Sequence, residues 1–79
     1  MTDGSAGLTL DCRGLACPMP VLKLSKTLKE VAVGGVVEML VTDPGSELDL
    51  EAYVDRTGHR LLERSEAKGV FRFLVQRTV

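Results

Sequence analysis

Two prolines that flank a methionine, directly after a cysteine, constrain the fold of this chain more than any other feature. The segment is Cys17-Pro18-Met19-Pro20, and an amphipathic pattern follows it. Proline is tolerated in the first turn of an α-helix, because the backbone N–H groups there have no partner within the helix. Pro18 at the first helical position and Pro20 at the third therefore predict a helix start, with Cys17 at the N-cap.

The spacing of apolar residues along the chain differs before and after this segment. Before it, apolar residues alternate with polar ones, which predicts a half-buried strand, and Gly14 gives the short connection its backbone freedom. After it, the apolar positions recur at helical spacing. The strand positions are Leu8, Leu10 and Cys12, and the helix positions are Val21, Leu24, Leu28 and Val31.

The rest of the chain predicts a second helix and three more strands. Strands are expected at 36–42, 59–65 and 70–77, and Ser46 with Asp49 resembles a capping box that opens a helix ending at Gly58. The order β-α-β-α-β-β predicts an α+β two-layer sandwich, in which two helices cover one face of a four-stranded mixed sheet. Residues 8–79 form one domain in this prediction, and residues 1–7 form a disordered N-terminal tail.

Composition narrows the classes of function. Ten basic and eleven acidic residues give a net charge of −1, so there is no basic footprint for nucleic acid, and no apolar run is long enough to span a bilayer. Two cysteines and one histidine are too few for a structural zinc site. We therefore expect a cytoplasmic protein without metal, cofactor, membrane or nucleic-acid partner, and with at least one reactive thiol.

Cys17 is the candidate reactive residue. A helix N-terminus favours an anion, which predicts a lowered thiol pKa and roughly a quarter thiolate at pH 7. Arg13 and Lys23 add to this effect if they turn inward, and the N–H of Met19 is the expected partner of the sulfur. His59 is the only histidine and has no expected reason to face Cys17. A cysteine hydrolase with its own base is therefore disfavoured, and a carrier thiol on a rigid mount is favoured.

The motif resembles the signature of the TusA/SirA-type sulfur carriers, a C-P-x-P segment after an L-D-x-x-G-L run. The matching residues are Leu10 to Pro20, and the resemblance extends to Asp43-Pro44-Gly45 and to Thr57-Gly58-His59. It implies that Cys17 holds sulfur as a persulfide, supported by Arg13, Gly14, Pro18, Met19 and Pro20. The chain departs from the family at Asp49-Leu50-Glu51, where D-I-P is frequent.

The resemblance also implies partner proteins. A cysteine desulfurase or a rhodanese-like protein would supply the sulfur, and an acceptor protein would receive it for tRNA thiolation, molybdenum cofactor assembly or sulfur metabolism. Whether such a sulfurtransferase-type carrier counts as an enzyme is a matter of convention, because it turns over only with its partners. Lys23 and Lys26 are candidates for docking an acidic partner, although a solvated helix face is the simpler interpretation.

Other hypotheses stay open at this point. Cys12 is expected in the core, but a reversible Cys12–Cys17 disulfide would make the chain a small redox or regulatory module. A nucleic-acid-binding module has only fold-level analogy behind it. Leu40 and Leu74 are expected on the open face of the sheet, so the chain is predicted to be a monomer or a weak dimer.

Overall fold

The computed structural model describes residues 8–79 and has the predicted order of elements. The predicted tail at residues 1–7 lies outside the described residues. The elements are β1 (Leu8–Cys12), α1 (Met19–Leu28), β2 (Val36–Val41), α2 (Ser46–Thr57), β3 (Arg60–Ala67) and β4 (Val70–Gln76).

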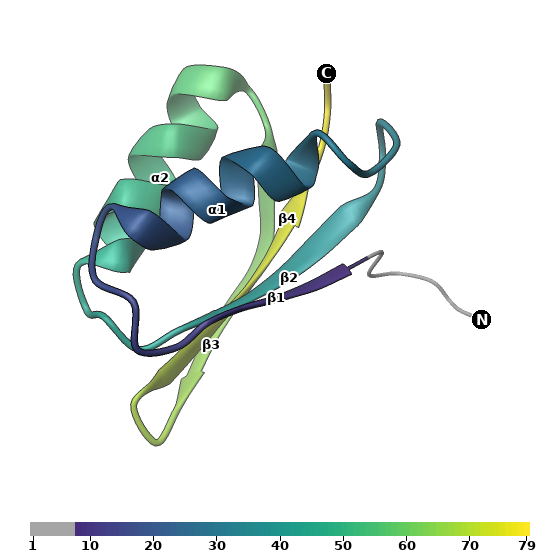
Figure 1. The fold of residues 1–79 in the computed structure, drawn as a ribbon. Helices are drawn as coiled ribbons and strands as arrows, with labels where there is room; N and C mark the ends of the chain where they lie inside the picture. Colours follow the sequence, from purple (N-terminus) through teal and green to yellow (C-terminus); the bar gives the residue numbers. More distant parts are fainter. Residues whose placement is uncertain (1–7) are drawn as a thin grey trace.

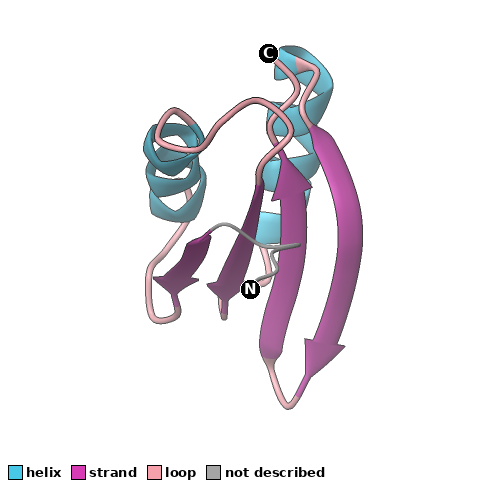
Figure 2. Cartoon of the chain, turned by 90° about the vertical axis from the view of Figure 1, so that its right-hand side faces the viewer, coloured by secondary structure: helices cyan, strands magenta, loops and turns pink. Residues whose placement is uncertain are grey.

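The four strands form one mixed sheet in the order β1-β2-β4-β3. β1 and β2 are parallel, and β4 is antiparallel to both β2 and β3. Both helices pack on the same face of the sheet, and the other face is left uncovered (Figures 1 and 2). The predicted α+β two-layer fold is therefore confirmed.

The core lies between this sheet face and the two helices. Strand register places Cys12 opposite Val41, and Met39 opposite Phe73, on the face that the helices cover. Burying each large apolar side chain contributes ~1.5–3 kcal/mol, so this cluster is the main source of favourable burial in the fold. Its members are Cys12, Leu24, Leu28, Val37, Met39, Val41, Leu50, Tyr53, Phe73 and Val75.

The uncovered face of the sheet is less apolar than the sequence indicates. Leu40 and Leu74 are on this face and are half-buried. Their neighbours across the strand pair are charged: Glu38 is opposite Leu74 and Arg72 is opposite Leu40. Glu38 accepts a hydrogen bond from the Thr9 hydroxyl (3.0 Å) and forms an ion pair with Arg72, so charged groups share this face with the two leucines.

The start of α1 differs by one residue from the prediction. The first helical residue is Met19, and Pro18 rather than Cys17 is the N-cap. A hydrogen bond from the Met19 N–H to the Ala16 carbonyl (2.9 Å) closes a turn just before the helix, which shifts both prolines toward the N-terminus of the helix. The helix ends at Leu28, so Val31 packs on the core from the following loop.

The predicted capping box of α2 is wrong. Gly45 is the N-cap, no side chain caps it, and Ser46 is buried as the first helical residue. Asp43 replaces the cap, because its backbone carbonyl accepts the Ser46 N–H (3.0 Å). The end of the helix is as predicted, since Gly58 takes the left-handed conformation (φ 87°) that favours glycine.

The remaining strand limits differ from the prediction by one or two residues. β2 and β4 each end one residue earlier, and β3 begins one residue later and ends two residues later. Within residues 8–79, neither helix is long and apolar enough to cross a membrane.

Candidate functional site: an exposed thiol between two helix N-termini

Parallel pairing of β1 and β2 brings two loops to one edge of the sheet. Each strand is followed by a loop and a helix, so both loops and both helix N-termini lie beyond the carboxyl ends of these strands (Figure 1). The first loop carries Cys17, and the second carries Asp43. Segments about 26 residues apart in the sequence thus form one site.

Cys17 is exposed, and two prolines follow it closely at the start of α1. The Cys17–Pro18 peptide is cis, Pro18 caps α1, and Pro20 is buried in the first turn. The Met19 N–H bonds to the carbonyl of Ala16, so it does not serve the sulfur as the sequence predicted. Pro18 and Pro20 therefore restrict the backbone next to Cys17, while a group other than the Met19 N–H contacts the sulfur.

Asp43 joins the two loops. One oxygen of its carboxylate accepts the Cys17 N–H (2.7 Å), and the other accepts the Gly45 N–H (3.3 Å). The neighbouring Thr42 hydroxyl accepts the Gly14 N–H (2.9 Å), and Gly14 itself has a positive φ (83°). The sequence analysis named Asp43 only as part of the matching segment Asp43-Pro44-Gly45, although aspartate in a turn is typical of side chains that accept nearby backbone N–H groups.

The sulfur of Cys17 contacts Asp49 in the first turn of α2, and the thiol donates a hydrogen bond to the carboxylate. This bond raises the pKa of Cys17 above its ordinary value, and partial burial and the negative charges of Asp49 and Asp43 add to the effect. The predicted lowering of the pKa is therefore wrong for the free protein. The helix N-terminus is present, but the hydrogen-bonded Asp49 and the nearby charge of Asp43 both favour the protonated thiol.

Arg13 does not contact the thiol. The Arg13 guanidinium pairs with Asp11 through two hydrogen bonds of 2.9 Å. The backbone N–H of Arg13 donates a third hydrogen bond to the same carboxylate (3.1 Å). These bonds lower the pKa of Asp11 to about 2. Asp11 thus forms hydrogen bonds at the end of β1 and holds Arg13, so Arg13 does not make the inward turn toward the thiol that the sequence analysis considered.

The outer face of α1 next to Cys17 combines apolar and basic side chains. Met19 (44% exposed) and Leu22 (52%) lie in a shallow hollow with Lys23 and Lys26. We call this surface the α1 face; Ser25 and Lys29 complete it. The structure thus brings the two lysines predicted for docking beside two exposed apolar residues that the sequence analysis did not assign to a surface.

Cys12 and His59 are away from this surface. Cys12 is fully buried in the core, as predicted, and burial raises the pKa of its thiol. His59 accepts the Thr78 N–H through Nδ1 (3.1 Å) and lies beside the ring of Tyr53. The contacts of Cys12 and His59 are those of residues with a structural role.

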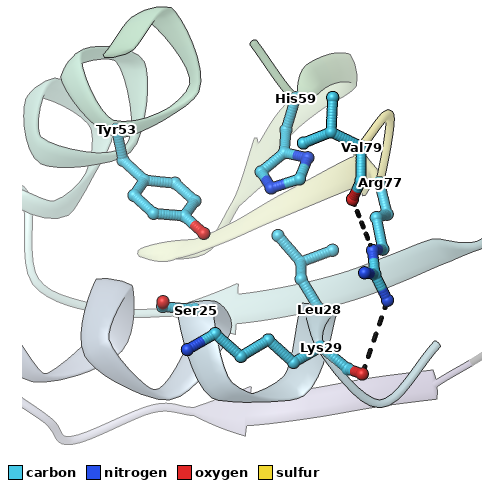
Figure 3. A pocket seen from close by; sticks show the side chains of 7 residues that line it. All are labelled: Ser25, Leu28, Lys29, Tyr53, His59, Arg77 and Val79. Atoms are coloured by element: carbon cyan, nitrogen blue, oxygen red, sulfur yellow. Dashed lines mark hydrogen bonds between the residues drawn. The ribbon is translucent and has the colours of Figure 1, made fainter. Parts of the chain in front are cut away.

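A separate pocket of about 210 Å³ lies at the opposite end of α1 (Figure 3). Arg77 closes one side by donating to the carbonyls of Val79 (2.7 Å) and Lys29 (3.4 Å). Its walls are Ser25, Leu28, Lys29, Tyr53, His59, Arg77 and Val79. Among residues 8–79, no group of three or more histidine, cysteine, aspartate or glutamate side chains could hold a metal ion.

Comparison with known proteins decides the family. The family model described as sulfurtransferase TusA matches residues 8–77. The chain belongs to the TusA family. That match spans all six elements of the fold and both loops of the site.

Individual TusA relatives agree with this assignment. The chain is 42% identical over 69 residues to the sulfur carrier protein TusA of Allochromatium vinosum, covering 87% of this chain and 91% of the relative. It is 38% identical over 77 residues to the TusA protein of Pseudomonas entomophila, covering 98% and 96%. A crystal structure of a SirA-like protein from Desulfitobacterium hafniense superposes with a TM-score of 0.79 at 30% identity, covering 91% of this chain and 99% of that one.

Proposed function

We propose that this TusA-family chain is a sulfur carrier that holds a persulfide on Cys17 and passes its terminal sulfur to an acceptor protein. The observation that carries the proposal is the exposed Cys17 thiol on a rigid proline-bounded turn, between two helix N-termini. Relatives over nearly the whole chain are sulfur carrier proteins by name. A reducing cytoplasmic setting keeps such a thiol available.

The proposed transfer is an exchange between a thiol and a persulfide. The sulfur of Cys17, once deprotonated, attacks the terminal sulfur of a donor persulfide. A new S–S bond forms on Cys17, the S–S bond of the donor breaks, and the donor cysteine leaves as a thiolate that takes up the proton. No oxidant or reductant is needed, because the sulfane sulfur keeps its oxidation state. The same exchange with an acceptor thiol unloads the carrier.

The α1 face is the surface that we propose for docking the donor. Exposed Met19 and Leu22 supply apolar contact next to the thiol, and Lys23 and Lys26 favour an acidic partner surface. A cysteine desulfurase or a rhodanese-like protein would fit this role, and the acceptor proteins belong to tRNA thiolation, molybdenum cofactor assembly or sulfur metabolism. We propose that the carrier acts as a monomer or weak dimer, without metal or cofactor.

The dithiol alternative receives no support from the site. Cys12 is fully buried on the face of β1 that the helices cover, whereas Cys17 is exposed at the surface. A disulfide between them would require the core to open, because the two α-carbons must come within ~4.4–6.8 Å with their side chains facing each other.

Intact mass spectrometry after incubation with a cysteine desulfurase and L-cysteine tests the proposal. We expect a gain of ~32 Da, reversed by reduction, in the wild type and in Cys12→Ala but not in Cys17→Ser. A gain that persists in Cys17→Ser refutes Cys17 as the carrier. If the desulfurase gives no gain, a rhodanese with thiosulfate is the second donor, and failure with both refutes the proposed function.

Charge reversal tests the docking surface. Lys23→Glu together with Lys26→Glu should raise the KM of the desulfurase for the carrier and change kcat little, because the lysines are proposed to contact the partner surface and not the exchanged sulfur. Arg60→Glu is the matched control, since Arg60 is exposed at the start of β3, at the other edge of the sheet from Cys17. Equal effects of the two changes would contradict docking on the α1 face.

A further inference from the structure

The close contact between the Cys17 thiol and the Asp49 carboxylate is not explained by sulfur transfer itself. A nucleophilic sulfur must lose its proton, yet the group nearest to it is an anion that accepts that proton as a hydrogen bond. The contact joins residues 32 positions apart, so it is produced by the packing of α2 beside α1 and not by local sequence.

No cation among the described residues compensates Asp49. The ion pairs within residues 8–79 leave Asp49 out, and Arg13, the basic residue nearest to Cys17 in the loop, is held by Asp11. Arg56, on the same helix as Asp49, lies over the ring of Tyr53 (5.9 Å from its guanidinium carbon to the ring centroid). Lys23 of α1 belongs to the outer face described above.

Asp43 is the other carboxylate near the sulfur, and its role is different. Its two oxygens are engaged by the N–H groups of Cys17 and Gly45, so it holds the backbone of the site together. Among residues 8–79, the Asp49 carboxylate makes its hydrogen bond with the thiol alone. Asp43 therefore supports the loop, and Asp49 contacts the reactive sulfur.

We infer that Asp49 is a positioning residue that holds the Cys17 thiol in its protonated, weakly nucleophilic form while the carrier is free. The inference rests on the proposed function, in which Cys17 exchanges sulfur with a docked partner. Asp49 also borders a groove of about 250 Å³ between α1 and α2, lined by Pro18, Val21, Leu22, Asp49, Ala52, Tyr53 and Arg56. A partner seated there lies directly against the carboxylate.

The hydrogen bond to Asp49 makes the reactivity of the Cys17 thiol different in the free carrier and in the docked carrier. In solution, the protonated thiol reacts slowly with small oxidants and electrophiles, because the thiolate is the reactive form. In the docked state, a partner group that engages Asp49 removes its hold on the proton. The Cys17 S–H bond then breaks during the exchange, and its proton ends on the thiolate that leaves the donor.

The rate of alkylation by iodoacetamide, measured against pH with no partner present, tests the inference. We expect Asp49→Asn to shift the midpoint of the pH profile downward and to raise the rate at pH 7 by roughly fivefold, the order of the effect of one adjacent charge at a water-exposed site. The modified residue is identified by peptide mass, and circular dichroism checks the fold of each variant.

Two further variants make the result specific. Asp55→Asn removes the same charge from an exposed position on the same helix and should leave the profile unchanged. Asp49→Glu keeps the carboxylate and should return the profile toward that of the wild type. If Asp49→Asn does not fold, Asp49→Ser provides the same comparison with a smaller side chain.

The inference is overturned if Asp49→Asn matches Asp55→Asn, or if its midpoint moves to higher pH. Neither result depends on sulfur transfer, because iodoacetamide needs no donor protein. Conversely, a failure to load sulfur in the mass assay would refute the proposed function and leave the effect of Asp49 on the thiol measurable.

Discussion

Replacing Cys12 by serine places a hydroxyl group in the core, between the sheet and the helices. Cys12 has no exposed surface, and its neighbour across the parallel ladder is the equally buried Val41. A hydroxyl buried without a hydrogen-bond partner costs ~1–3 kcal/mol, so we expect Cys12→Ser to lower the free energy of unfolding by about 2 kcal/mol. Cys12→Ala removes the sulfur and adds no polar group, which costs about 1 kcal/mol.

These losses are large for so small a domain. At ~0.05–0.15 kcal/mol per residue, a chain of this length has a total stability of ~4–12 kcal/mol. With a urea m-value of ~1 kcal/mol/M, the midpoint of unfolding should fall by about 2 M in Cys12→Ser and about 1 M in Cys12→Ala. Urea titrations followed by circular dichroism measure both shifts.

Sulfur loading should not fall with stability in the two Cys12 variants. Sulfur loading, measured by intact mass under conditions where both variants are folded, should remain near the wild-type level, because Cys12 lies in the core and not at the site. A Cys12→Ser variant as stable as the wild type would refute the burial argument. A folded Cys12→Ala variant that no longer accepts sulfur would refute the single-thiol mechanism and restore the dithiol hypothesis.

Three further predictions concern the supports of the site and the fold. Asp43→Ala should destabilise the chain by ~1–2 kcal/mol in urea titrations and slow sulfur loading, because it removes the acceptor of the Cys17 N–H; unchanged loading would contradict a role in holding the loop. Asp11 should titrate near pH 2 by NMR, because Arg13 lowers its pKa in the folded protein. The small stabilisation from this exposed pair is therefore present above an ordinary carboxyl pKa and is lost as the pH falls toward 2. A normal midpoint would show that the pair does not form in solution. Gly58→Ala should cost ~1 kcal/mol in thermal or urea unfolding, because Gly58 ends α2 at positive φ, and no loss there would mean that the helix ends differently.

Local features of the sequence predicted the elements well. Period-two alternation marks β1, helical spacing marks α1, and Gly58 ends α2 where expected, because each pattern reflects neighbours a few residues apart. The exact helix starts were missed. A backbone turn just before each helix determines them here: the hydrogen bond from Met19 to Ala16 at α1 and the one from Ser46 to Asp43 at α2.

The site was only half predictable for the same reason. The prolines after Cys17 are adjacent in the chain, so the sequence alone determined that this cysteine lies at a helix start on a strand-to-helix loop. The proton affinity of its thiol was decided by tertiary structure. Parallel pairing of β1 with β2 brings Asp43 and Asp49 to the sulfur, and electrostatic interaction depends on distance in space rather than along the chain.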